Sequence, residues 1–425
     1  MNLKAALVGL LLPLRDAGAR GPAPDQHALE GIHDPASSAP QAGPRPGTVP
    51  DGLHRPTDVR DSWKTRLFEL HRRLVEIESI SNHEHAVGRF LQHYLHANGL
   101  TVERQQVPRP PSDRHVGPAR PDRPRYNIYA HAGGPGEARV VLTSHIDTVP
   151  PFYPYTRHDD GSIGGRGVVD AKACVAAQVI AALQLMTDGP AAGVSHPIAL
   201  LFVVGEERGG DGMRKVNELG RRWDAVIFGE PTEFKLVTGH KGNLGFSLTA
   251  TGKGGHSGYP EVGKNANLVL VRALTALADM TMPWSEKYGN SSLNIGWMEG
   301  GVAGNVIAER ARAAIQIRVA DGTADEMKEL VLRTVEGVDR TIAVQWLSDG
   351  YGPVDIDSDI DGFEKMTVNY GTDIPNLRGD HKRYLYGPGS ILVAHSDHEA
   401  LFPEDLVTAV HGYKKIARAA LGMEY

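Results

Sequence analysis

Runs typical of β-strands alternate with runs typical of helices along most of this chain, and this order restricts the fold more than any other feature of the sequence. Such alternation predicts an α/β fold with a mostly parallel sheet and helices on both faces. The run ARVVLTS carries no charge after Arg139, which is typical of a strand buried on both faces. The strand-like runs are 101–107, 138–144, 197–204 and 225–230, and the main helix-like run is 171–186.

The order of the elements changes near residue 242, where the pattern becomes βαββαβ. This order predicts a small two-layer domain with an antiparallel sheet. Because an α/β pattern returns after about residue 352, we expect 242–351 to be inserted into one larger domain made of 58–241 and 352–425. The expected strands of the inserted domain are 245–254, 291–300, 310–319 and 341–347, and its helices are 267–280 and 323–337.

The amino-terminal residues have the composition of a leader. MNLKAALVGLLLPL places a lysine before an apolar run that is too short to span a bilayer but fits a secretory signal. We therefore expect a signal peptide at 1–19 and a secreted protein, with a disordered apolar start as the alternative. Residues 20–57 are rich in Pro, Gly, Ala and Ser, which indicates a flexible leader or propeptide. Asn290-Ser291-Ser292 is a glycosylation sequon that only a secreted glycoprotein would use.

Composition and charge exclude some classes of partner. The chain is 41% hydrophobic and 23% charged, as in ordinary globular proteins, and its formal net charge is −6. Without a long basic run, this balance argues against nucleic acid as the main partner, and no apolar run is long enough for a membrane span. The single cysteine, Cys174, cannot form an internal disulfide, and its alanine-rich surroundings predict a buried, inert thiol.

The stretch LTSHIDTVP places a histidine and an aspartate two residues apart where a predicted strand ends. Side chains two apart on a strand share a face, so His145 and Asp147 would point the same way. Ligands of open α/β sheets bind at the carboxyl ends of the strands. An ordinary polar loop is the alternative, and the pair needs partners elsewhere in the chain to form a site.

Four further stretches place carboxylates or a histidine after runs that look strand-like. Each alone could be a helix cap or a polar loop, but together with His145 they would meet at one edge of the sheet. Nitrogen and oxygen ligands without a thiolate suit zinc, cobalt or manganese. The negative charges of three ligating carboxylates and one hydroxide would equal the positive charges of two divalent ions. This set of ligands therefore favours two metals over one. The residues are Asp170, Glu206, Glu207, Glu230 and His395.

These stretches occur in an order that resembles a known enzyme family. The chain is similar to the di-zinc hydrolases that include acetylornithine deacetylase, succinyl-diaminopimelate desuccinylase, glutamate carboxypeptidase and aminoacylase. Within this family, the sequence particularly resembles the secreted fungal members called probable carboxypeptidases. The resemblance extends from about residue 60 to the end and rests on SHIDTVP, GRGVVDAKA, GEERGGDG, GEPT, GKGGHSGYP and GPGSILVAHSDHEA.

The resemblance implies a site with two zinc ions, for which cobalt or manganese could substitute. His145 and Glu230 would bind one zinc, and Glu207 and His395 would bind the other. Asp170 would bridge both ions. An aspartate often stands where this chain has His398, which leaves a small ambiguity between His398 and His395 as the ligand. The spacing to Glu399 and to GPGS favours His395.

The resemblance also implies roles for the residues around the metals. Glu206 would be the general base. Asp147 would accept a hydrogen bond from His145 and fix its tautomer. The family usually has a cis peptide after the bridging aspartate, here Asp170-Ala171. The family motif DxKG reads DAKA here, with Ala173 in place of glycine, so the start of the following helix could be altered.

Residues of the inserted domain and of GPGS would act on the substrate. In the family, the histidine that matches His256 reaches across a homodimer, formed through the inserted domain, and stabilises the oxyanion in the partner's site. Asn305 and Arg318 match positions that hold the substrate's carbonyl and carboxylate, although Arg318 could equally be an outward-facing strand residue. Gly389 would allow the backbone to approach the substrate closely.

These features predict an enzyme that hydrolyses an amide bond next to a free carboxylate. Secretion favours a carboxypeptidase acting on peptides, and the alternative is an N-acyl amino acid deacylase. A remote alternative is a metal-binding dimeric module without catalysis, which the loss of Glu206 or of a ligand would have favoured. Every one of these residues is present.

Overall fold

The computed structural model describes residues 62–109, 123–133, 138–187 and 197–423. The expected signal peptide and leader at 1–57 lie outside these residues. Among the helices of the described part, none combines the length and the apolar character needed to cross a membrane.

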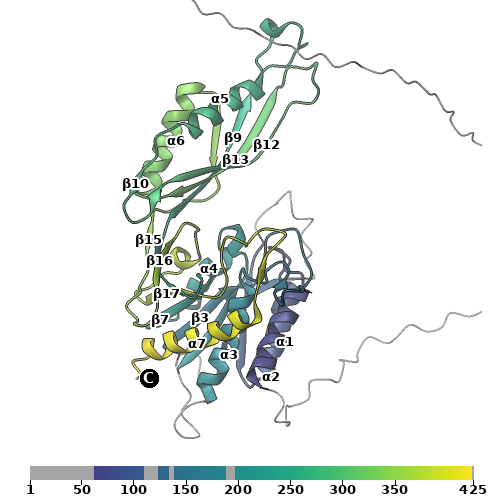
Figure 1. Cartoon of the computed structure of the whole chain (residues 1–425). Helices are drawn as coiled ribbons and strands as arrows, with labels where there is room; N and C mark the ends of the chain where they lie inside the picture. Colours follow the sequence, from purple (N-terminus) through teal and green to yellow (C-terminus); the bar gives the residue numbers. More distant parts are fainter. Residues whose placement is uncertain (1–61, 110–122, 134–137, 188–196, 424–425) are drawn as a thin grey trace, which may run out of the picture. The chain divides into compact units, whose positions relative to one another are not determined.

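A six-stranded sheet forms the centre of the larger domain (Figure 1). Four neighbouring strands run parallel, and two antiparallel strands extend the sheet at one edge. The prediction of a mostly parallel sheet is therefore confirmed, although the second strand of the chain was not predicted. In sheet order the strands are β1 (Thr101–Val107), β2 (Arg125–His131), β6 (Ile198–Val203), β3 (Val140–His145), β7 (Ala225–Gly229) and β17 (Lys382–Tyr386).

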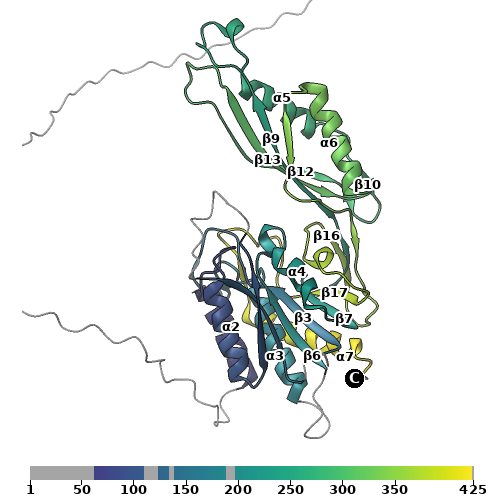
Figure 2. The same cartoon turned by 180° about the vertical axis from the view of Figure 1, so that it is seen from behind.

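Both faces of this sheet are buried. In β3, Val140 and Leu142 pack into the core on one face, whereas Val141 belongs to the core on the other. The first face is covered by the helices α1 (Trp63–Glu76), α2 (His85–Ala97), α3 (Lys172–Thr187) and α7 (Pro403–Ala420), all labelled in Figure 1; Figure 2 shows α2, α3 and α7 from behind. The second face is covered in part by the short helix α4 (Asp211–Val216).

The inserted domain has its own sheet and its own core. Its four strands are all antiparallel, and two helices pack on the sheet around a separate apolar cluster, which confirms the predicted βαββαβ order. A small hairpin, β10 (Trp284–Ser285) and β11 (Gly289–Asn290), precedes the third element. In sheet order the strands are β12 (Ser292–Gly300), β13 (Arg310–Val319), β9 (Gly242–Thr251) and β14 (Ala343–Trp346), and the helices are α5 (Ala266–Ala278) and α6 (Ala324–Val338).

Two small sheets complete the fold. In the first, β8 (Leu236–His240) lies between β15 (Val354–Asp355) and β16 (Lys365–Val368), so the chain leaves the larger domain after β8 and returns beside it at β15. The second contains β4 (Thr156–Arg157), β5 (Ile163–Gly164) and β18 (Ala400–Leu401), which brings the segment before α7 next to the segment before α3. Single turns of 3-10 helix occur at η1 (Glu206–Arg208), η2 (Asn217–Leu219), η3 (Pro260–Val262) and η4 (Ile374–Asn376).

Two runs that we expected to be strand-like are not strands. GRGVVD, which ends at Asp170, forms turns, and Gly167 adopts a φ of 84° there. Val168 and Val169 are nevertheless fully buried, so their apolar character reflects core packing within a turn. SILVAH, which ends at His395, also forms turns and exposes most of Leu392. An apolar run of this length does not by itself specify a strand, because tertiary packing can bury it in other ways.

Candidate metal centre

Asp170 lies between two histidines and faces each with a different carboxylate oxygen. Its Oδ1 atom is 3.0 Å from Nε2 of His145, and its Oδ2 atom is 3.4 Å from Nε2 of His395. The Asp170 and His145 side chains are buried, whereas that of His395 is half-exposed. One carboxylate therefore reaches two imidazole nitrogens, which is the arrangement that a ligand shared by two ions requires.

Each histidine also faces a glutamate. Oε1 of Glu230 is 3.8 Å from Nε2 of His145, and Oε2 of Glu207 is 3.0 Å from Nε2 of His395. Two ligand atoms on a tetrahedral zinc ion, each about 2.0–2.1 Å from the metal, are about 3.3 Å apart. The distances from each histidine nitrogen to its two neighbouring carboxylate oxygens lie on either side of this value. These side chains therefore fit two neighbouring metal positions.

Adjacent parallel strands bring three of these segments together. His145 ends β3, the acidic pair Glu206 and Glu207 follows β6, and Glu230 follows β7. These three strands are neighbours in the order β6-β3-β7 and run parallel, so their carboxyl ends meet at one edge. Asp170 and the His395 loop reach the same edge from turns, which the sequence did not predict.

The cluster concentrates buried negative charge. Burial raises the pKa of Glu207 to about 7, and the nearby Asp170 carboxylate adds to the effect. Burial likewise raises the pKa of Glu230 to about 7, against the favourable field of His145. In Asp170, hydrogen bonds from both histidines outweigh burial and lower the pKa. Carboxylates crowded in this way are stabilised by a bound cation, so the electrostatics of the site also fit divalent metal ions.

Glu206 lies beside the cluster. One of its carboxylate oxygens is within 4.8 Å of ligand atoms of both His145 and Glu230. Burial raises its pKa well above the usual range, and the negative charge of Glu230 adds to this effect. A buried carboxyl group beside these possible metal ligands is placed to accept a proton and to release it again.

Asp147 holds the backbone of the acidic pair. Its carboxylate accepts hydrogen bonds from the N–H groups of Glu206 and Glu207, at 3.1 and 3.3 Å, and from the hydroxyl of Ser81 at 2.7 Å. The contact with His145 differs from the expectation: Nδ1 of His145 is 3.0 Å from the backbone carbonyl of Asp147 and 3.6 Å from its carboxylate. Asp147 therefore orients the histidine mainly through its carbonyl group, and its carboxylate binds the acidic pair.

The local departures from the family motif leave the cluster intact. His398 lies 3.0 Å from the Asp397 carboxylate and is exposed, so the structure brings His395, and not His398, to the cluster. The peptide bond between Asp170 and Ala171 is cis, as the resemblance implies. Ala173 is fully buried near the start of α3, which begins at the adjacent lysine.

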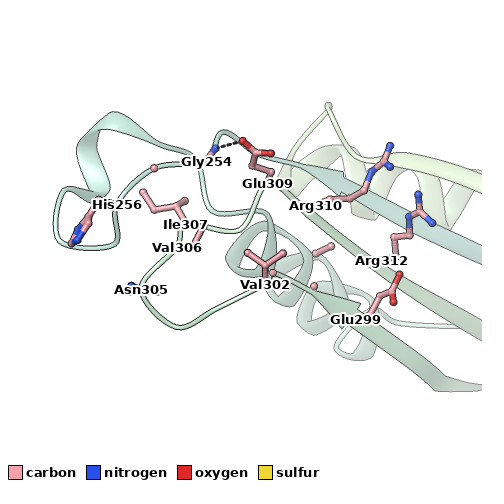
Figure 3. A pocket seen from close by; sticks show the side chains of 14 residues that line it. Gly254, His256, Glu299, Val302, Asn305, Val306, Ile307, Glu309, Arg310 and Arg312 are labelled. Atoms are coloured by element: carbon pink, nitrogen blue, oxygen red, sulfur yellow. Dashed lines mark hydrogen bonds between the residues drawn. The ribbon is translucent and has the colours of Figure 1, made fainter.

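His256 and Asn305 line a pocket of about 840 Å³ in the inserted domain (Figure 3). They lie on two loops joined by a hydrogen bond from the N–H of Ser257 to the carbonyl of Asn305, at 3.1 Å. Both residues are exposed, and His256 accepts a hydrogen bond at Nδ1 from the N–H of Gly258, at 3.0 Å. Among the described residues, His256 forms its hydrogen bond, its ring contact and its β-bridge within this domain, so the structure does not bring it to the metal cluster of its own chain.

Arg318 and Gly389 both have close contacts with neighbouring residues of their own chain. Nη1 of Arg318 is 3.3 Å from Oδ1 of Asn243, and a Cβ atom on Gly371 would lie 3.2 Å from the same nitrogen. Gly389 has a φ of 77°, and a Cβ atom there would lie 2.7 Å from Val169. This close packing requires glycine independently of any substrate.

Several residues that support the site were not predicted from the sequence. Ser81 binds Asp147, and the buried Arg125 forms an ion pair at 2.8 Å with the partly exposed Asp211. The Glu399 carboxylate binds the segment that precedes Asp170. None of these residues follows a strand, and their partners are distant in the sequence, so no local pattern identifies them.

Comparison with known proteins agrees with this geometry. Residues 238–336 match the family model described as a peptidase dimerisation domain. A probable carboxypeptidase of Aspergillus fumigatus is 46% identical over 386 residues, which cover 84% of this chain and 87% of that protein. A relative this similar over this share of the chain establishes common family membership.

Three solved structures share the fold. Human carnosine dipeptidase 1 has a TM-score of 0.67 at 16% identity and covers 85% of this chain and 97% of its own. An M20 family metallo-carboxypeptidase of Sulfolobus solfataricus has a TM-score of 0.63 at 17% identity, with 84% and 99% covered. The Bacillus subtilis YXEP protein, a dinuclear metal binding peptidase from the M20 family, has a TM-score of 0.57 at 15% identity, with 85% and 99% covered. These likenesses show the shared fold, and the fungal relative together with the matched dimerisation domain shows that the chain belongs to the M20 family of metallopeptidases.

Proposed function

We propose that this protein is a metallo-exopeptidase of the carboxypeptidase type, which hydrolyses the amide bond next to the free carboxylate of a peptide. The observation that carries the proposal is the position of Asp170 between His145 and His395, with Glu206 beside them. The name of the Aspergillus fumigatus relative, probable carboxypeptidase, supports the same activity.

Two zinc ions are the metals that best suit the ligand set, with cobalt or manganese as substitutes. His145 and Glu230 would hold one ion, and Glu207 and His395 would hold the other, with Asp170 shared between them. The distances from His145 to Asp170 and Glu230, and from His395 to Asp170 and Glu207, support this assignment. The dinuclear site named for the Bacillus subtilis structure supports a count of two. When bound, the ions would polarise the scissile carbonyl and make the attacking water more acidic.

Glu206 would move the proton that the reaction requires. As the water oxygen forms a bond to the carbonyl carbon, the Glu206 carboxylate would take a proton from that water. It would then donate this proton to the amide nitrogen as the C–N bond breaks. Its burial, and the raised pKa that follows, support both steps, because a carboxylic acid with an ordinary pKa would hold the proton too weakly.

The inserted domain would supply the groups that bind the substrate. Arg318 would bind the free carboxylate of the substrate, Asn305 would bind its carbonyl, and His256 would stabilise the oxyanion in the partner subunit's site. Outside the inserted domain, Gly389 would let the backbone approach the substrate. The exposure of His256 and Asn305 on neighbouring loops supports a role toward a second molecule (Figure 3).

The protein would act as a homodimer formed through the inserted domain. The family match to a dimerisation domain supports this assembly. Strand β12 is the edge of its sheet and pairs only with β13 within the described chain. Large apolar side chains on β12 and the adjacent helix α5 are exposed, which is unusual for a surface that remains in water. They are Ile295, Trp297 and Met298 on β12, and Leu268 and Val271 on α5.

We further propose that the enzyme is secreted and glycosylated. The apolar start of the chain supports a signal peptide at 1–19, and the exposed position of Asn290 is compatible with a glycan. Detection of the processed protein in culture medium, with a mass decrease at Asn290 after glycosidase treatment, would support this proposal. A protein that stays in cells with residues 1–19 intact would contradict it.

Replacement of Glu206 tests the proposed activity. Glu206→Gln keeps the size of the side chain but cannot accept a proton, so it should retain both metals by elemental analysis and lose turnover. Glu336→Gln, on the exposed face of α6, is the matched control and should keep both. An active Glu206→Gln enzyme would exclude the assigned role, and a wild-type protein that binds metal but hydrolyses no amide would favour the non-catalytic module.

A substrate panel separates the carboxypeptidase from the deacylase. Purified enzyme would be assayed with dipeptides, with longer peptides and with N-acetyl amino acids at equal concentration. We expect the highest kcat/KM for peptides with a free carboxyl terminus and little turnover of their amidated forms, because Arg318 would lose its partner. A preference for N-acetyl amino acids, including N-acetylornithine, would instead identify a deacylase.

A further inference from the structure

The segment that precedes Asp170 is bound by a single buried carboxylate, that of Glu399. Oε1 of Glu399 accepts hydrogen bonds from the N–H groups of Val169 and Asp170, at 2.9 and 3.1 Å. Oε2 accepts a hydrogen bond from the N–H of Gly167 at 3.2 Å and one from the guanidinium of Arg166 at 3.0 Å. The four donors use all the acceptor positions of the carboxylate, which is 3% exposed as a residue.

The same residue ends the loop that carries His395. This loop is tied to the rest of the domain at both ends. At its start, the N–H of Glu233 donates to the carbonyl of Gly389 at 2.9 Å, and at its end Glu399 binds the Asp170 segment. Between these points His395 has a φ of 64° and a half-exposed side chain, so the loop itself provides little packing to fix the imidazole.

We infer that Glu399 is a positioning residue that holds the His395 loop against the Asp170 segment and thereby sets the affinity of the metal position formed by Asp170, Glu207 and His395. The inference rests on the proposed metal site. The position formed by His145, Glu230 and the shared Asp170 depends on it less, because two of its three ligands, His145 and Glu230, directly follow or end strands of the central sheet. Loss of Glu399 should therefore weaken one metal position selectively.

Glu399→Gln is the variant that tests this role. It preserves the shape of the side chain but places an NH2 group against two of the four donors. Zinc would be titrated into the metal-free protein in competition with a chromophoric chelator, which resolves the two binding steps. We expect one of the two steps to lose affinity by about 10–100-fold, the range for residues that orient metal ligands, while the other step changes less than about threefold.

The matched control is Glu404→Gln, the same chemical change on an exposed residue in the first turn of α7. It should titrate like the wild type. The double variant Arg166→Gln/Glu399→Gln removes the buried ion pair as a whole. If Glu399 only neutralised Arg166, the double variant would restore both steps; if it holds the backbone N–H groups, the selective loss remains.

The outcomes separate this inference from the proposed function. Equal weakening of both steps, or two unchanged steps, in a Glu399→Gln protein that melts cooperatively would overturn the positioning role. If the variant does not fold, Glu399→Asp, which keeps the charge and shortens the reach, is titrated in its place and judged by the same two criteria. A wild-type protein that binds no zinc would refute the metal site itself.

Discussion

The carboxylate of Asp147 accepts a hydrogen bond from the backbone N–H of Glu206 over 3.1 Å. Asp147 is fully buried, and its other carboxylate oxygen accepts hydrogen bonds from Glu207 N–H and from the Ser81 hydroxyl. Asp147, two residues after His145, thus fixes the turn that carries both the proposed base and a proposed ligand. Its carboxylate acts on the site through the backbone of its neighbours.

Asp147→Asn should lower turnover while the metals stay bound. Asparagine keeps only one acceptor oxygen and has an NH2 donor in place of the other, so one backbone N–H of the acidic pair would lose its partner. We expect kcat to fall by about 10–100-fold and the metal content to remain near the wild-type value. Ser81→Ala removes one hydrogen bond and should have a smaller effect in the same direction. Assays and elemental analysis on the same preparations check both.

Asp349→Asn, on an exposed residue of the inserted domain, is the control and should behave as the wild type. Complete loss of both metals from Asp147→Asn would show that Asp147 is needed to form the metal site as such. Unchanged kcat would show that the turn keeps its geometry without the carboxylate.

Metal removal should destabilise the protein more at neutral pH than at acidic pH. Without a cation, burial raises the pKa of Glu207 and of Glu230 from 4.5 to about 7. A carboxyl group with a raised folded-state pKa contributes stability that is complete below pH 4.5 and is lost as the pH rises through 7. Bound metal ions compensate the charge, so the loaded protein avoids this loss.

The melting temperatures of zinc-loaded and chelator-treated protein should therefore diverge as the pH rises from 5 to 7.5. Scanning calorimetry at several pH values measures the gap. Glu230→Gln has one buried carboxylate fewer, so its metal-free form should lose less stability over the same range. A gap that is constant or that narrows with pH would contradict the assigned electrostatics.

The sequence predicts best the residues whose position follows from one strand. His145 and Glu230 lie at the ends of neighbouring parallel strands, so a correct sheet already places them together. Asp170 and His395 reach the site from turns, and only the order of motifs pointed to them. Their support depends on contacts that no local pattern encodes, since 229 residues separate Asp170 from Glu399.

A charge on the exposed apolar face of the inserted domain should separate the proposed dimer. Val271 is about half-exposed on α5, and Trp297 is similarly exposed on the edge strand β12. Val271→Glu or Trp297→Glu would bury a carboxylate in an interface, which is strongly unfavourable without a partner. Light scattering should give a dimeric mass for the wild type and a monomeric mass for each variant.

The dimer also matters for activity if His256 acts in the partner's site. Monomeric variants should then lose activity, and mixing an inactive Glu206→Gln protein with an inactive His256→Ala protein should restore part of it, because a mixed dimer has one complete site. Gln345→Glu, on an exposed residue of the opposite edge strand β14, is a control for the added charge. A wild-type protein that is monomeric at assay concentration and fully active would contradict the arrangement.

His71 should contribute to acid sensitivity of the fold. Its Nε2 atom is 2.9 Å from the carbonyl oxygen of Val168, in the turn before Asp170, and the residue is fully buried. Burial lowers its pKa from 6.5 to about 4; nearby Lys172 acts in the same direction, and the hydrogen bond opposes it. The folded state therefore binds fewer protons than the unfolded state between these values.

Because of this difference, the contribution of His71 to the free energy of unfolding is complete above pH 6.5 and is lost as the pH falls toward 4. A shift of this size corresponds to about 3 kcal/mol at most, since one pKa unit is about 1.4 kcal/mol. His71→Gln can still donate to Val168 but does not titrate, so its free energy of unfolding should fall less steeply over this range. Denaturant titrations at pH 7, 5.5 and 4.5 measure the slope, with exposed His93→Gln as the control. Because all other groups are shared, equal slopes for His71→Gln and the wild type would show that His71 does not remain neutral in the folded protein.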